Sequence, residues 1–385
     1  MKITNVRSVY EAIKINKPII DRIIKYAKNG DVAGFTPPSS IIGEKNYPKV
    51  SIGVLFNDMS DSSVCDDHMV WTRENYDVSR ILAAKAGLVN AVTKVEADRP
   101  DTGFMQKIQL AIISKTEVPI NASISRLGIS PYGDGFRPVS ARLERLRISD
   151  DVKTEKTVER VFYDRDMKAE DGIALLGREG VDGDKISRIL SVGAMGHKRK
   201  IVPTKWAITA VDDTLGKRLL DTVRSLETSE TYGIKTGSFL GNRFTFIFIR
   251  GEWSFELIEA WNRNEEEIMV GESDYELYDG RKEYVKNTAG AYYAIRLAVL
   301  EKLSQMKIQC SVIVIREVTP EYFAPLGVWV VREGARKSLR GELELFQDID
   351  HALKSARDRM IYDGTMEKSR ILKLRRAQTR LSAFF

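Results

Sequence analysis

The last eight residues of the chain carry its most specific pattern of side chains. The pattern is Q-x-x-L-x-x-F-F, formed by Gln378, Leu381, Phe384 and Phe385. In a short helical turn, the leucine and the two phenylalanines fall on one side, where they form an apolar plug beside the glutamine amide. Exposed aromatic rings carry a large apolar area that favours burial. The spacing is typical of peptides that dock onto sliding clamps, and it predicts such a partner.

A second interpretation of the same terminus is a helix that folds back onto the protein core. Leu372, Leu374 and Leu381 have the spacing of an apolar stripe on such a helix. The preceding segment is strongly basic, and its cations are Lys368, Arg370, Lys373, Arg375 and Arg376. This charge suits a mobile tail that is attracted to an acidic clamp surface or to nucleic acid. We therefore favour the docking peptide.

Carboxylates give weaker candidates for catalysis. Asp212 and Asp213 follow an apolar stretch, residues 203–211, that resembles a strand. Paired carboxylates after a strand can hold Mg²⁺ beside phosphate oxygens, although capping of a following helix explains them better. Glu317 follows the apolar strand predicted at residues 310–315, at a place where α/β proteins often position polar groups of a site. Packing and ion pairing explain this glutamate nearly as well.

A glycine-containing loop at residues 193–200 gives a candidate site for phosphate. Its last four residues are potentially cationic: His197, Lys198, Arg199 and Lys200. Exposed amides and positive charge in such a loop can hold a phosphate group. A solvated turn between a helix and a strand is an equally good interpretation.

An acidic stretch gives candidate metal ligands. Within eleven residues the chain carries Asp58, Asp61, Asp66, Asp67 and His68. Asp66, Asp67 and His68 could ligate a hard cation, but the spacing does not fit the calcium-binding loop. We favour a hydrated acidic loop without a metal.

The sequence lacks the motifs of several common enzyme classes. There is no G-x-x-x-x-G-K-[ST], and Gly177, Gly180 and Gly183 do not form the dinucleotide-binding fingerprint. The nucleophile motif G-x-S-x-G is also absent. ATPase and dinucleotide-dependent oxidoreductase functions therefore lose their usual support. The residues alone leave open whether the chain is an enzyme and which cofactor it would use.

Composition permits a nucleic-acid partner without requiring one. The 385 residues include 60 basic and 54 acidic side chains, for a net charge of +6. The two cysteines, Cys65 and Cys310, cannot form a disulfide framework or a Cys-x-x-Cys metal site, which favours the reducing cytoplasm. No stretch of eighteen apolar residues occurs, so we expect no membrane association.

The candidate groups must be positioned by strands and helices, and signals for both alternate along the chain. Strands are predicted at residues 47–56, 105–113, 122–124, 203–211, 243–249, 310–315 and 328–331. Helices are predicted at residues 8–28, 76–92, 254–261, 292–303 and 347–360, and Asp184 is expected to cap a helix towards residue 192. This interleaving predicts a mixed α/β (α+β) fold: one compact body, or two closely packed subdomains, with a mixed sheet and flanking helices, and a flexible C-terminal tail.

Several sequence blocks span nearly the whole chain and are specific in combination. They are residues 36–39 (TPPS), 47–50 (YPKV), Gly53, 185–194 (KISRILSVGA), 202–206 (VPTKW), 208–213 (ITAVDD), 287–294 (NTAGAYYA), 315–317 (IRE) and 320–329 (PEYFAPLGVW). In these blocks and in the terminal motif, the sequence resembles the archaeal Nre family of DNA-repair proteins.

The resemblance implies an organisation and a role. It implies an N-terminal region over residues 1–270 and a C-terminal region over 271–362, followed by a basic tail with the docking peptide at 363–385. It also implies a function in the archaeal DNA-damage response, with the PCNA sliding clamp and DNA as partners. Many members open with a four-cysteine zinc module, but this chain has no cysteine before Cys65, so we expect no zinc module.

Two main hypotheses follow for the function. The first is a DNA-repair factor that PCNA recruits through the terminal motif. The alternative is a metal-dependent enzyme acting on nucleic acid or a nucleotide, with carboxylates near 212–213 and the basic loop 193–200. A scaffold that joins another protein to the clamp is a third interpretation.

Overall fold

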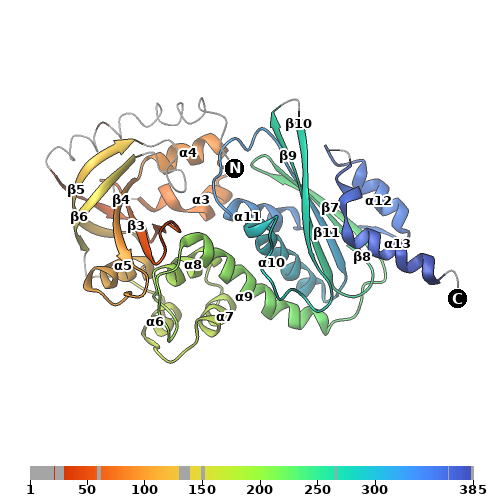
Figure 1. Cartoon of the computed structure of the whole chain (residues 1–385), viewed down its shortest axis with the longest axis horizontal. Helices are drawn as coiled ribbons and strands as arrows, with labels where there is room; N and C mark the ends of the chain where they lie inside the picture. The colour runs from red at the N-terminus through yellow and green to blue at the C-terminus, as the bar shows by residue number, and fades with distance from the viewer. Residues whose placement is uncertain are drawn as a thin grey trace. The chain divides into compact units, whose positions relative to one another are not determined.

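The computed structural model describes residue 21 and residues 30–58, 62–129, 139–148, 152–264, 267–362 and 364–382. The helix predicted at 8–28 lies outside these residues except for Asp21. The chain forms two compact units (Figure 1). The first comprises Met1–Thr214 with Phe323–Leu326, and the second comprises Leu215–Tyr322 with Gly327–Phe385.

The described strands of the first unit form a six-stranded mixed sheet with the order β1-β5-β6-β4-β3-β2. Neighbouring strands are antiparallel except β4 and β6, which are parallel. The strands are β1 (Asp31–Thr36), β2 (Ser40–Ile42), β3 (Lys49–Phe56), β4 (Val89–Glu96), β5 (Val118–Ile129) and β6 (Val139–Ile148).

Strand β6 shows how the sequence determines the faces of this sheet. Val139, Ala141 and Leu143 are buried at alternate positions, and the alternation resumes at Leu146 after a one-residue shift. The shift lies where the register with β5 changes, so Glu144 is the extra residue of a β-bulge. The bulge keeps the apolar side chains of both halves of the strand buried.

Helices of the first unit carry the groups discussed below. Helix α5 contacts β6 and α8, and α7 contacts both α6 and α8. The helical elements are η1 (Ser62–Asp66), α3 (His68–Arg73), α4 (Val78–Ala86), α5 (Gly103–Ile113), α6 (Lys156–Tyr163), α7 (Ala169–Arg178) and α8 (Gly183–Ser191). Helix α9 (Thr204–Arg224) follows, and the division between the units falls within it.

The described strands of the second unit form another six-stranded mixed sheet, in the order β10-β9-β11-β8-β7-β12. The parallel pair here is β9 and β11. The strands are β7 (Tyr232–Phe239), β8 (Asn242–Ile249), β9 (Ser254–Asn264), β10 (Glu267–Glu276), β11 (Ser311–Val318) and β12 (Glu344–Phe346). A two-residue turn of Leu240 and Gly241, both with positive φ, joins β7 to β8.

Helices cover both faces of this second sheet (Figure 1). They are α10 (Ala289–Met306), α11 (Trp329–Ser338), α12 (Ile349–Arg357), η2 (Met366–Lys368) and α13 (Arg370–Ser382). Alternate residues of β8 divide between two cores: Phe246 packs with α10 and α11, whereas Ile247 packs with α12 and the start of α13. The sheet is therefore the middle layer of three, which explains why β11 is buried along its whole length.

The predicted mixed α/β class is confirmed, although several element assignments are wrong. Strands were expected at 203–211, 105–113 and 328–331, but residues 204–211 belong to helix α9, 105–113 to helix α5, and 329–331 to the start of α11. Residues 254–261 form β9 instead of a helix, and 76–92 divide between α4 and β4. A short apolar run does not by itself distinguish a strand from a buried helix. In α9, Ala207 and Val211 are both buried, and their four-residue spacing is that of a helix.

Candidate functional site

The C-terminal helix α13 begins at a buried carboxylate of the second sheet. Glu256 of β9 is fully buried, and its carboxylate accepts hydrogen bonds from the amides of Arg370 at 2.8 Å and Ile371 at 3.1 Å. The Ser369 hydroxyl donates to the same carboxylate at 2.6 Å. The first amides of a helix lack partners within it and carry partial positive charge, so an anion at this end stabilises the helix.

A second buried carboxylate holds the segment before α13. Glu317 of β11 accepts hydrogen bonds from the amides of Ile361 and Tyr362, both at 2.6 Å. Burial raises the pKa of this carboxyl above its ordinary value, while the two amide hydrogen bonds oppose the rise. Glu317 was expected just after a strand, but it lies within β11 because that strand continues to Val318. Its observed contacts are with the protein backbone.

The beginning of α13, from Arg370 to Arg375, packs on the protein, as the alternative interpretation of the terminus predicted. Ile371 and Leu372 belong to the apolar core beneath α12, and Arg375 donates a hydrogen bond to the Ser311 hydroxyl at 2.8 Å. Leu374 is 44% exposed, so the predicted stripe is only partly buried. Arg376 is exposed.

The docking motif begins at the other end of α13. The backbone from Gln378 to Ser382 is helical, which agrees with the helical turn that the motif requires. Leu381 lies nine residues after Leu372, and at a rise of 1.5 Å per residue this places its backbone about 13 Å along the helix from the packed turn. Phe384 and Phe385 lie outside the described residues.

The cationic side chains of the basic loop, residues 193–200, are of two kinds: one is buried and the other three are exposed. Arg199 is buried, and its guanidinium donates to the carbonyls of Phe162 at 2.6 Å, Asp164 at 3.2 Å and Gly196 at 3.2 Å. His197, Lys198 and Lys200 are exposed. Arg199 therefore ties the loop to the end of α6, and the other three side chains remain available for an anion.

Asp212 and Asp213 do not follow a strand. Both lie within helix α9, where Asp212 is buried and Asp213 is half-buried. The helix begins directly after Pro203, whose carbonyl accepts from the amides of Trp206 and Ala207. Neither aspartate caps a following helix either, because α9 continues to Arg224.

The predicted acidic metal ligands have separate roles. Asp67 is the N-cap of α3 and accepts from the amides of Met69 and Val70. Asp66 accepts from the Ser39 hydroxyl and forms an ion pair with Arg188 at 3.5 Å. His68 is directed elsewhere, so these three residues do not converge.

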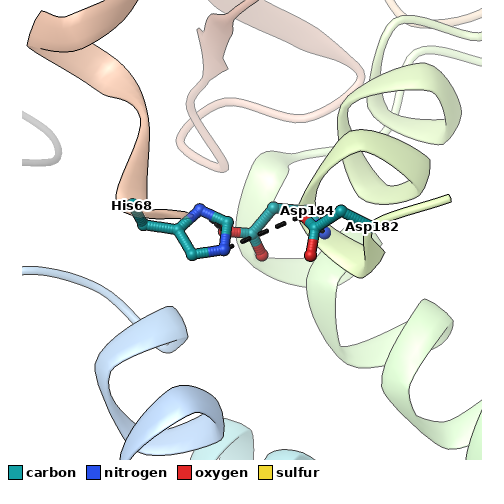
Figure 2. Close-up of side chains that lie close together, drawn as sticks. All are labelled: His68, Asp182 and Asp184. Carbon is teal, nitrogen blue, oxygen red and sulfur yellow. Dashed lines mark hydrogen bonds and ion pairs between the residues drawn. The ribbon is translucent and has the colours of Figure 1, made fainter. Parts of the chain in front are cut away.

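His68 instead meets two aspartates at the start of α8 (Figure 2). Its Nδ1 lies 3.2 Å from Oδ2 of Asp184, and its Nε2 lies 3.8 Å from Oδ1 of Asp182. One ligand atom from each of the three residues fits within 4.8 Å of the others. The sequence predicted Asp184 as a helix cap, but the N-cap is Asp182, whose carboxylate accepts from the Asp184 amide at 2.9 Å.

Lys185 follows this pair on α8 and points into the protein. Its ammonium group donates to the carbonyls of Ile112 and Ser114. Burial, with a smaller contribution from the charge of Arg188, lowers the pKa of Lys185 to about 7. No sequence pattern identified Lys185 or the meeting of His68 with Asp182, because both depend on the packing of α8 against distant segments. The sequence signal that could have drawn attention to this part of the chain is the Asp-Gly-Asp run before an amphipathic helix.

Comparison with known proteins assigns the chain to a family. The archaeal Nre N-terminal domain matches residues 10–265, and the archaeal Nre C-terminal domain matches residues 276–384. The chain therefore belongs to the archaeal Nre family, which confirms the resemblance seen in the sequence blocks. The two matches meet between residues 265 and 276, whereas the compact units of the structure divide after Thr214.

Named relatives cover most of the chain. The chain is 34% identical to the DNA repair protein NreA of Haloferax volcanii, over 84% of this chain and 81% of the relative. It is 32% identical to NreA of Archaeoglobus fulgidus over 91% of this chain and 89% of that protein, and 31% identical to NreB of the same organism over 91% of each. No solved structure matches the chain. None of the described helices has the length and apolarity that crossing a bilayer requires.

Proposed function

We propose that this protein is a DNA-repair factor that the PCNA sliding clamp recruits through Gln378, Leu381, Phe384 and Phe385. Support for the repair role comes from its relatives, which are named DNA repair proteins. Support for the clamp comes from the terminal Q-x-x-L-x-x-F-F pattern, whose leucine and phenylalanines suit an apolar pocket.

The arrangement of α13 is the observation that carries this proposal. Glu256 and the packing of Ile371 and Leu372 attach the beginning of the helix to the second sheet. The motif starts at the opposite end, beyond the exposed Leu374. A docking peptide must leave its own protein to enter a pocket on another, and a motif at the end of α13 opposite to its attached beginning suits this requirement.

The attached helix also acts as a tether. Binding of the terminal residues to a clamp raises the local concentration of both units near the clamp without further contacts. We propose the archaeal cytoplasm as the location of this role, because the DNA to be repaired lies there.

DNA contact is part of the same proposal. His197, Lys198 and Lys200 are exposed on one short loop, and Arg376 is exposed on α13. Lysine and arginine side chains that approach phosphates release counterions and favour binding. We propose that the loop contacts the DNA backbone while the tail holds the clamp.

Calorimetric titration of the full chain into PCNA from the same organism tests the docking. Changing Leu381, Phe384 and Phe385 together to alanine removes the apolar plug, so we expect affinity to fall at least about 100-fold, since such buried anchors dominate binding energy. Leu374→Ala is the matched control, because it removes an exposed leucine of the same helix outside the motif. Equal affinity for the triple variant and the wild type would refute the docking role.

The alternative, a metal-dependent enzyme with Asp212, Asp213 and the basic loop, gains no support from these residues. The expected strand before the two aspartates is a helix, and Glu317 belongs to the other compact unit. Their catalytic role stays a prediction from sequence.

A further inference from the structure

His68, Asp182 and Asp184 bring together a nitrogen ligand and two oxygen ligands from distant parts of the first unit. His68 is the first residue of α3, while the aspartates flank Gly183 at the start of α8. Figure 2 shows the imidazole facing both carboxylates across the gap between the two segments. We propose that these three side chains bind one divalent transition-metal ion.

The distances suit a shared ion. Bonds from zinc and similar ions to histidine nitrogen and carboxylate oxygen are about 2.0–2.2 Å, so two ligands of one ion lie up to roughly 4.3 Å apart. The two short distances involve different ring nitrogens: Nδ1 lies 3.2 Å from Asp184, and Nε2 lies 3.8 Å from Asp182. One ion binds one of these nitrogens, and a set of one ligand atom from each residue lies within 4.8 Å, which is slightly beyond this limit. Small rotations of the side chains therefore close the three atoms around one ion.

The charge of the cluster favours a cation. The side chain of His68 is only 5% exposed, and those of Asp184 and Asp182 are 14% and 29% exposed. Histidine binds a metal ion in its neutral form, so the two carboxylates supply the charge of −2 that a divalent ion neutralises.

Local structure positions the ligands before an ion arrives. Asp67 caps α3 and fixes the backbone that carries His68. The Asp182 carboxylate caps α8 through the Asp184 amide, which sets the spacing of the two aspartates. The ion pair of Arg188 with Asp66 joins α8 to the segment just before His68. Ligands held in this way lose little conformational freedom on binding.

The donor set indicates the class of ion. One imidazole with two carboxylates suits Mn²⁺, Fe²⁺ or Zn²⁺ better than the all-oxygen sites typical of Ca²⁺. Three protein ligands leave coordination positions open for water or for a phosphate oxygen. The partial exposure of Asp182 leaves one side of the cluster accessible to solvent.

Titration of the full chain with Mn²⁺ after dialysis against EDTA tests the proposal. We expect one equivalent of Mn²⁺ to bind, seen as loss of the free-ion electron paramagnetic resonance signal, and the melting temperature to rise with Mn²⁺ concentration. Asp184→Asn and His68→Gln should each weaken binding at least tenfold and remove the thermal shift. Zn²⁺ should compete for the site.

Asp98→Asn is the matched control, because it makes the same chemical change at an exposed aspartate of the same compact unit, outside the cluster. This variant should bind Mn²⁺ like the wild type. Absence of saturable Mn²⁺ and Zn²⁺ binding by the wild type would overturn the proposal and show that the cluster is a structural ion pair. Undiminished binding by folded Asp184→Asn would overturn it too, because the ion would then lie elsewhere. Neither result would affect clamp docking, which uses a different compact unit.

Discussion

Neighbouring cations of the basic loop have different physical roles. Arg199 is buried among carbonyl groups, whereas Lys198 and Lys200 extend into solvent. The sequence grouped them as one phosphate-binding candidate because it shows only their shared charge. Their separation depends on the burial of Arg199 against α6, which no local pattern reveals.

Because of this difference, we expect substitution of the exposed lysines to change DNA binding and substitution of Arg199 to change stability. Lys198→Ala with Lys200→Ala should weaken binding to duplex DNA and reduce the slope of log affinity against log salt by about 2, because two phosphate contacts are lost. The melting temperature should not change. Fluorescence anisotropy with labelled DNA at several salt concentrations measures both the affinity and the slope.

Arg199→Ala is the comparison variant for this experiment. It should lower the free energy of unfolding by about 1–3 kcal/mol, since its loss leaves buried carbonyls without their donor. An unchanged salt slope in the double lysine variant would contradict the proposed DNA contact.

Candidate residues that depend on tertiary contacts were the hardest to identify from sequence. His68 was noticed for its acidic neighbours Asp66 and Asp67, but its observed partners are Asp182 and Asp184. Asp184 was expected to cap α8, whereas the N-cap is Asp182, two residues earlier in the chain. Sequence spacing can indicate which residues share a helix face, but it does not show which distant segment packs opposite.

At the scale of elements, two buried glutamates attach the C-terminal segment to the second sheet. Glu317 holds Ile361 and Tyr362, and Glu256 holds the start of α13. Glu256 had suggested the first turn of a helix at 254–261, because acidic residues are common there. The residue does interact with a helix start, but that helix is α13, more than a hundred residues further along the chain.

Glu256→Gln should loosen the start of α13. The amide keeps the shape of the carboxylate but loses its charge, so we expect the free energy of unfolding to fall by about 1–3 kcal/mol. Hydrogen–deuterium exchange at residues 370–372 should become faster. Affinity for PCNA should change less than twofold, because the docking residues are intact.

Glu252→Gln is the control for this change, since Glu252 is exposed near the start of the same strand. Exchange in α13 as slow as in the wild type would show that Glu256 does not anchor the helix.

Some predicted strands match the structure closely, whereas some short apolar runs that were predicted as strands are helices. The strands expected at 47–56 and 243–249 match β3 and β8 closely, and the helix expected at 292–303 lies within α10. The runs at 105–113 and 203–211 became helices because their apolar residues pack at helical spacing against neighbouring elements.

At the scale of the whole molecule, two compact units with separate mixed sheets share one chain. The proposed metal cluster and the basic loop belong to the first unit, while the clamp-docking helix belongs to the second. The sequence predicted one compact body or two closely packed subdomains, because no Gly/Ser-rich linker interrupts the interleaved strands and helices. The boundary falls inside the continuous helix α9, where composition gives no signal.

The central claim is that this protein acts in DNA repair at the clamp, and survival of DNA damage tests it most directly. Three archaeal strains are compared after ultraviolet and alkylation damage: wild type, a deletion, and a chromosomal L381A/F384A/F385A variant expressed at the wild-type level. We predict that the deletion strain is sensitive and that the variant is nearly as sensitive, because the protein no longer reaches the clamp. A variant that survives like the wild type beside a sensitive deletion strain would contradict recruitment, and a deletion strain as resistant as the wild type would contradict the repair role itself.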